Sequence, residues 1–200
     1  MKQFGSYETA VAPKPMPKLP VGNYILKIMD AEEVEFRNGG SALKVSFDIA
    51  EGEFKDFFAQ NYRAQIGEDK RWKGTLIMYV PKEDGSEQDG WTANAFKGNI
   101  VAIEESNLGY HWDWNEKGLK GKKVGGVFFE KEWEFDGKTG FATTCHSFKS
   151  IDLVKSGTLK TPKPKLLKNR PADINVKPDP ADFDISGFEE INTDDGELPF

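Results

Sequence analysis

Alternating apolar and polar positions run through much of the first 154 residues, and this period of two predicts a mainly β protein. The alternation is clearest in residues 43–49, where every second side chain is a large aliphatic or aromatic group. Five segments carry strand-like patterns: residues 24–36, 43–49, 72–80, 119–135 and 141–154. Glycine-containing turns at residues 37–40 and 136–140 join two pairs of these strands as hairpins.

Two other segments show helical spacing of their apolar residues. Residues 92–105 place Ala95, Phe96, Ile100 and Ile103 on one side of a predicted helix, and residues 53–62 predict a short helix or helical turn. The main order is therefore three strands, a helix and two strands. That order is typical of the OB-fold, a five-stranded Greek-key barrel with its helix between strands three and four. A β-sandwich and an open α+β sheet remain alternatives.

Composition changes along the chain and divides it into four parts. Residues 1–20 contain prolines 13, 15, 17 and 20 and are expected to form an extended leader. Residues 21–157 form the predicted OB-fold domain. Residues 158–182 are a basic, proline-rich linker and residues 183–200 an acidic tail, and both are expected to be disordered.

The net charge of −6 is unevenly distributed. Residues 1–150 carry 20 basic and 23 acidic residues, a net charge of −3. Residues 151–177 carry seven basic and two acidic residues, a net charge of +5, whereas residues 178–200 carry eight acidic residues and no basic one. Without those last 23 residues the chain would carry a charge of +2. A polyanion such as nucleic acid would therefore compete with the acidic tail for the same basic groups.

Composition also limits the cellular compartment in which we expect the protein and the kinds of catalytic or metal site that it can form. The single cysteine, Cys145, excludes an internal disulfide, and the chain shows no secretory signal or long apolar run, which indicates a cytoplasmic protein without a membrane span. Cys145 and His146 are neighbours on a predicted strand, so their side chains point to opposite faces and disfavour a shared metal site. No catalytic triad, metal cluster or phosphate-binding loop is found, so we expect neither an enzyme nor a bound cofactor.

The last seven residues place an apolar tip behind a cluster of carboxylates. The tip residues are Asp194, Asp195, Glu197, Leu198, Pro199 and Phe200. An acidic peptide with an apolar end suits a basic-rimmed pocket on a partner protein. Together with the OB-like element order and the linker, this tip resembles the single-stranded DNA-binding proteins of bacteria and their phages. The long segment 119–135 and residues 52–62 are more similar to the phage-encoded members.

The resemblance implies a division of labour between domain and tail. The OB-fold would bind single-stranded DNA during replication, recombination and repair, and the tip would recruit other proteins of those processes in the bacterial cytoplasm. Gly196 and Glu197 depart from the family's run of aspartates, although Glu197 preserves the charge. An OB-fold adaptor that binds only proteins is the alternative. The sequence does not determine the oligomeric state, and a homodimer is one option.

Binding of single-stranded DNA without sequence preference needs cations for phosphates and aromatic faces for bases. Residues 63–73 offer both, and Lys44 is expected on the outward face of the second strand with Lys27 as its cross-hairpin partner. The full set of candidates is Lys27, Lys44, Arg63, Lys70, Arg71, Trp72, Lys73, Tyr110, Trp112, Trp114, Lys131 and Trp133.

The fourth predicted strand separates its side chains by charge. Lys131, Trp133 and Phe135 should share one face, so any contact with DNA uses that face. The glutamates at positions 130, 132 and 134 should form an exposed acidic face that repels phosphate. Burial in the barrel is favoured over base stacking for Trp133 and Phe135, because a barrel has one interior to fill. For Trp72 the two roles are equally favoured.

Overall fold

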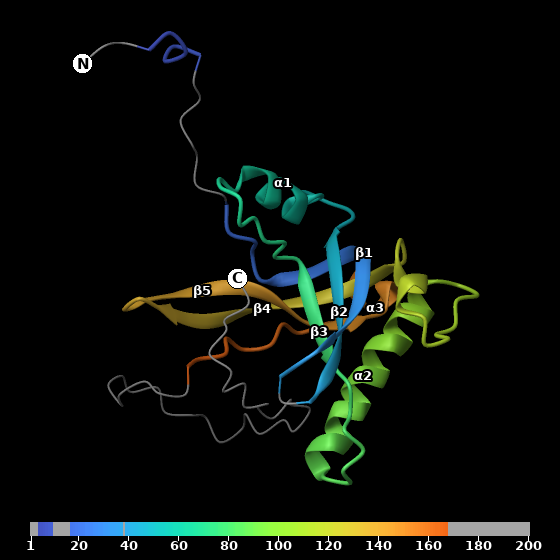
Figure 1. The fold of residues 1–200 in the computed structure, drawn as a ribbon. Coiled ribbons are helices and arrows are strands. Elements are labelled where there is room, and N and C mark those ends of the chain that lie inside the picture. The colour runs from blue at the N-terminus through green and yellow to red at the C-terminus, as the bar shows by residue number, and fades with distance from the viewer. Residues whose placement is uncertain (1–3, 10–16, 38, 168–200) are drawn as a thin grey trace.

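Five strands pair in one antiparallel sheet in the computed structural model, which describes residues 4–9, 17–37 and 39–167 (Figure 1). The strand order across the sheet is β3-β2-β1-β4-β5. The elements in chain order are β1 (Gly22–Glu35), β2 (Ser41–Ile49), α1 (Phe57–Ala64), β3 (Thr75–Tyr79), α2 (Glu87–Ser106), the 3-10 helix η1 (Glu116–Leu119), β4 (Lys123–Phe135), β5 (Lys138–Lys149) and α3 (Ile151–Lys155).

The sheet has Greek-key order but is open. Because β4 lies beside β1 and not beside β3, strands β1 to β4 take the spatial order 4-1-2-3. The edge strands β3 and β5 approach within 8 Å between Cα atoms, yet no ladder of hydrogen bonds joins them. The expected closed OB barrel is therefore not confirmed. Closure depends on strand tilt and stagger, which the order of elements along the chain does not determine.

Helix placement also differs from the expected OB-fold order, in which one helix lies between strands three and four. α2 occupies that place and α1, between β2 and β3, overlaps the short helix predicted over residues 53–62, whereas α3 after β5 was not predicted. The carboxylate of Asp48, buried on β2, accepts hydrogen bonds from the backbone N–H groups of Phe58 and Ala59, both at 2.9 Å. This side chain therefore fixes the first turn of α1 against the sheet.

A bulge in β1 lets this strand pair with two neighbours. Residues 22–27 pair with β4 and residues 26–35 pair with β2, with a register shift between Ile28 and Asp30. The resulting register places Glu32 opposite Lys44, and Asp48 opposite Lys27. The expected Lys27–Lys44 pairing across the hairpin is therefore wrong, because the register that runs back from the Glu35–Ser41 pair at the turn places Lys44 opposite Glu32, and the bulge shifts the remaining pairs by only one residue.

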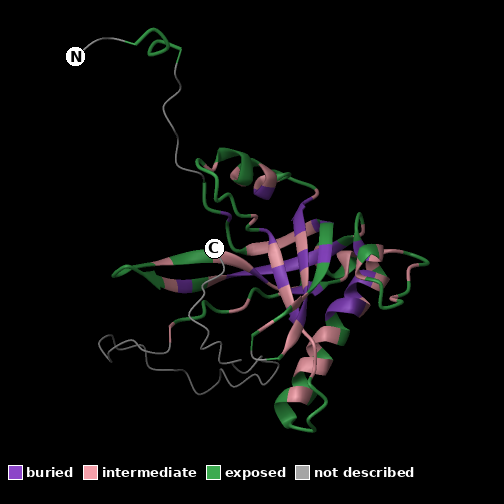
Figure 2. Ribbon diagram, in the orientation of Figure 1, coloured by how far each residue is buried: buried purple, intermediate pink, exposed green. Residues whose placement is uncertain are grey.

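The core lies between the sheet and two of its helices, as the buried band across the strands in Figure 2 shows. Phe47 packs edge-to-face against Phe58, Phe128 and Phe148, with ring centroids 5.6 to 6.0 Å apart. α2 contributes Ile100 and Ile103, and the Asn99 side-chain oxygen accepts a hydrogen bond from Phe148 N at 2.7 Å. These contacts join α1, α2 and the sheet into one core.

The segments on either side of the predicted domain also contact it. Leu19 of the expected leader is 3 % exposed, and its carbonyl accepts a hydrogen bond from the Thr143 hydroxyl. Within the expected linker, the Leu159 carbonyl accepts from the Asn23 side chain, and Lys165 pairs with β4. Residues 168–182 of the linker and the acidic tail lie outside the described residues. None of the helices in the described residues has the length and apolar character of a membrane span.

Candidate nucleic-acid interface

The outer face of the β4–β5 hairpin carries a row of aromatic and basic side chains. Asp136 and Gly137 form its two-residue turn with φ values of 49° and 68°, the left-handed conformations of a type I′ turn. From the turn back to the Phe128–Cys145 pair the register is unbroken, so alternate side chains keep to one face. That face carries Phe129, Lys131, Trp133 and Phe135 of β4. We call these four residues, together with Lys165, the hairpin face.

The outer aromatic rings of the hairpin face are not core residues. Phe135 is 62 % exposed. Trp133 is half-buried, but it does not belong to the described residues that pack against the core. Phe129 is buried and packs edge-to-face against His146, with ring centroids 5.3 Å apart. The expectation of burial is therefore wrong for Phe135, because the hairpin extends beyond the rest of the sheet (Figure 1).

Lys165 joins the hairpin face from a distant part of the chain. Its backbone forms a parallel bridge with Lys131: Glu132 N donates to Lys165 O at 2.8 Å and Lys165 N donates to Glu130 O at 2.9 Å. Paired residues of a parallel bridge direct their side chains to the same face. Neither Lys131 nor Lys165 takes part in a salt bridge within residues 4–9, 17–37 and 39–167. Sequence reasoning missed Lys165, since nothing local indicates this pairing.

The electrostatics of this region favour an anion. Partial desolvation lowers the pKa of Lys131, and the neighbouring charge of Lys165 lowers it further. Burial lowers the pKa of His146, with smaller contributions from Lys149 and Lys165. Burial is the main cause of both shifts, and the smaller contributions from neighbouring lysines show that positive charges lie close together here, which a bound anion would stabilise.

The opposite face of the hairpin exposes less negative charge than its three glutamates suggest. Glu132 is only 3 % exposed, and its Oε2 accepts a hydrogen bond from Leu167 N at 3.1 Å. Glu130 forms an ion pair with Lys18, whose Nζ also lies 6.0 Å from the centre of the Phe141 ring. The expected exposed row of three glutamates is therefore wrong at Glu132, because segments from both ends of the domain cover this part of β4.

A second basic and aromatic cluster lies at the end of α1 and in the connection from α1 to β3. Arg63, Lys70, Arg71 and Lys73 are all exposed there. Trp72 packs against the core and its Nε1 donates to the carbonyls of Phe47 and Gly74, both at 3.1 Å, so this indole is partly structural. The exposed ring is that of Tyr62, 5.9 Å from Trp72 and 6.0 Å from Lys70 Nζ. Tyr62 was missed because its spacing in the helical pattern favoured a core position.

The three candidate residues in the aromatic loop after α2 differ in their exposure. Tyr110 and Trp112 pack against the core, whereas Trp114 is 78 % exposed. Trp114 has a φ of 64° and stacks on Phe96 of α2, with ring centroids 6.4 Å apart and planes 11° apart. Desolvation raises the pKa of Tyr110, and the nearby carboxylates of Asp113 and Glu104 raise it further. This loop therefore offers one exposed ring, that of Trp114.

Two predicted lysines lie on another part of the sheet. Lys44 forms an ion pair with Glu32 at 2.8 Å, and Lys27 lies between Asp48 and Lys123 in the strand register. The structure thus separates the predicted residues into four places: the hairpin face, the α1–β3 connection, the loop after α2, and the β1–β2 surface. Residues 194–200 lie outside the described residues.

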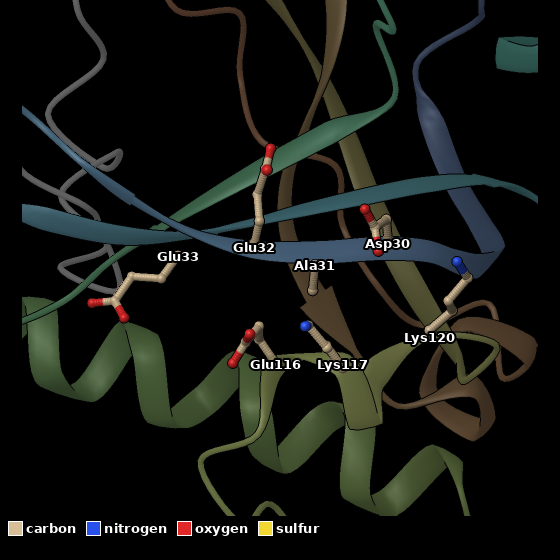
Figure 3. A pocket seen from close by; sticks show the side chains of 7 residues that line it. All are labelled: Asp30, Ala31, Glu32, Glu33, Glu116, Lys117 and Lys120. Atoms are coloured by element: carbon tan, nitrogen blue, oxygen red, sulfur yellow. The ribbon is translucent and has the colours of Figure 1, made fainter.

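The pocket between β1 and η1 does not suit a polyanion (Figure 3). Its volume is about 550 Å³. Four carboxylates and two ammonium groups line it: Asp30, Glu32, Glu33, Glu116, Lys117 and Lys120. The excess of negative charge repels phosphate. In the described part of the chain, no group of three or more His, Cys, Asp or Glu side chains is placed to hold a metal ion.

No model of a known protein family matches the chain, and a search of curated proteins finds no match.

Proposed function

We propose that this protein binds single-stranded DNA without sequence preference and that the hairpin face is its central contact surface. The observation that carries the proposal is the combination on this face of aromatic rings outside the core, Trp133 and Phe135, with two lysines that form no ion pair in the described residues. Bases stack on such rings, and each stacked base contributes about 1–3 kcal/mol. Lysines that are not already paired with carboxylates can neutralise phosphates and release counterions.

The topology supports the finer proposal that the domain is an OB-fold. Many OB-folds are partly open five-stranded Greek-key barrels, and the 4-1-2-3 order together with the proximity of β3 and β5 agrees with that description. OB-folds use strand faces and the loops between strands to hold oligonucleotides. The β4–β5 hairpin includes one of these loops, and the basic α1–β3 connection would add a second cationic surface.

The proposed role is the protection of single-stranded DNA during replication, recombination and repair in a bacterial cytoplasm. The acidic tip, with Leu198, Pro199 and Phe200 behind its carboxylates, would recruit other proteins of those processes. This part of the proposal rests on the resemblance of the tip to that of the bacterial and phage single-stranded DNA-binding proteins.

Titration with oligo(dT) at several salt concentrations tests the proposal. We expect quenching of tryptophan fluorescence and an affinity that falls linearly with salt on a log–log plot. Trp133→Ala should weaken binding about 5- to 150-fold, the effect of one lost stacking contact. Trp91→Ala is the matched control, because Trp91 is a 43 % exposed indole on α2, away from the hairpin. Equal affinities of the two variants would contradict the assignment of the hairpin face.

A second candidate function, a protein-only adaptor, is favoured by one observation. Trp114 presents an exposed indole beside Asp113 and above Phe96, which suits an apolar or basic protein segment better than a phosphate backbone. Absence of any response to oligo(dT) at low salt would contradict DNA binding and favour the adaptor.

A further inference from the structure

The stretch that contributes Lys165 is held to β4 by a very short ladder. The pairing of this stretch with β4 is an isolated bridge, in which Lys165 supplies both of the backbone groups that face β4. Within the described residues, its backbone contacts with β4 include the two hydrogen bonds of the Lys131–Lys165 bridge and the bond from Leu167 N to the Glu132 carboxylate. A strand held in this way can detach without disturbing the rest of the sheet.

The two lysine side chains of the bridge repel each other, although their backbones are joined by hydrogen bonds. Lys131 and Lys165 project from the same face, and like charges placed directly opposite each other destabilise a strand pair. The carboxylate nearest in sequence on one side, Glu130, is paired with Lys18. Lys149 and Lys165 both act on His146 nearby, so the surroundings add further positive charge.

We propose that residues 163–167 form a phosphate-gated strand, in which a phosphate group shared by Lys131 and Lys165 fastens the segment to β4. The phosphate converts a repulsive pair into two attractive contacts, so the anion binds the docked strand more tightly than the detached one. Coupling between sites is reciprocal, and docking must therefore strengthen anion binding by the same factor. The inference rests on the proposed function in taking the phosphate to be that of a single-stranded DNA backbone.

This arrangement would connect the DNA contact to the rest of the chain. Leu167 is the last described residue, and the acidic residues 178–200 follow 11 positions later in the sequence. DNA on the hairpin face would thus fix the point from which the tail departs. The gate acts through the two lysines and not through the sequence of the DNA.

Hydrogen exchange of the full-length protein, with and without oligo(dT) at low salt, tests the gate. We expect DNA to slow exchange of the Glu132, Lys165 and Leu167 amides about fivefold or more, the lower end of typical coupling between sites. Oligo(dT) that binds by fluorescence but leaves these amides unchanged would overturn the gate while sparing the proposed function. Absence of binding at low salt would overturn both.

A charge-reversal variant distinguishes docking of the strand onto β4 from binding of DNA. Lys165→Glu should slow exchange of the same amides in the absence of DNA, because the new carboxylate attracts Lys131, and it should weaken oligo(dT) binding. Lys160→Glu is the matched control: it makes the same charge change at an exposed residue five positions earlier in the chain, outside the gated strand and its bridge. Exchange in DNA-free Lys165→Glu that equals exchange in Lys160→Glu would overturn the gate.

Discussion

The indole of Trp133 on β4 lies over Gly140, its paired residue on β5. A Cβ atom on Gly140 would stand 2.7 Å from Trp133 Cζ2, closer than side-chain atoms approach one another. The missing side chain therefore leaves the space that the ring occupies. This fit holds a large aromatic ring on the hairpin face without support from the hydrophobic core.

Gly140→Ala should displace the Trp133 ring and weaken binding of single-stranded DNA. We expect a loss of about 1–3 kcal/mol in binding free energy, the contribution of a stacked base, with little change in melting temperature. Fluorescence titration with oligo(dT) and thermal unfolding measure the two effects. Gly98→Ala on α2 is the control, because a Cβ there meets nothing within 4 Å. That control should gain about 0.5–1 kcal/mol of stability and keep its DNA affinity.

Asp48→Ala should destabilise the protein through α1. The Asp48 carboxylate accepts three backbone hydrogen bonds, from Ile49, Phe58 and Ala59. Removal leaves buried donors without an acceptor, so we expect a loss of at least about 1–3 kcal/mol in the free energy of unfolding, measured with urea. Asp48→Asn keeps one acceptor oxygen and should lie between wild type and alanine. Asp69→Ala, at an exposed loop position, should be nearly neutral, and an equal effect of the two alanine changes would contradict this role.

His146 should make stability depend on pH. Burial and the charges of Lys149 and Lys165 hold its pKa below the ordinary value of 6.5, so the folded protein binds this proton less readily than the unfolded chain. Stability should therefore fall as the pH drops from 6.5 toward the lowered pKa, and should not change through this group above 6.5. Melting temperatures between pH 5 and 7.5 measure the effect.

His146→Gln should remove that part of the pH dependence. The variant keeps a polar side chain beside Ser147, to whose hydroxyl His146 Nδ1 lies at 3.2 Å, but it cannot take up a proton. His111→Gln controls for loss of an imidazole at an exposed position. An unchanged pH profile in His146→Gln would contradict the assignment.

Deletion of residues 194–200 should abolish recruitment of partner proteins and leave affinity for single-stranded DNA equal or higher. The deletion removes the apolar tip and three carboxylates, which compete with DNA for basic groups. Pull-down of replication and repair proteins from bacterial extract and titration with oligo(dT) measure the two properties. A clear loss of DNA affinity would contradict the separation of roles between domain and tail.

Local patterns in the sequence predicted much of the hairpin face. The positive-φ turn at Asp136 and Gly137 and the alternation that follows it need only neighbouring residues, so Lys131, Trp133 and Phe135 were placed together correctly. Strand ends were less well predicted. β3 begins at Thr75 and not at residue 72, because the Trp72 indole bonds to backbone carbonyls beside it.

The sequence by itself determined the five strands, the helix before β4, the uneven charge and the shared face of β4, because each depends on residues close together in the chain. Tertiary structure decided what depends on distant residues. It left the sheet open, buried Glu132 against Leu167, and brought Lys165 beside Lys131. Such contacts arise only when the folded backbone brings separate segments together, and hydrophobic periodicity carries no information about them.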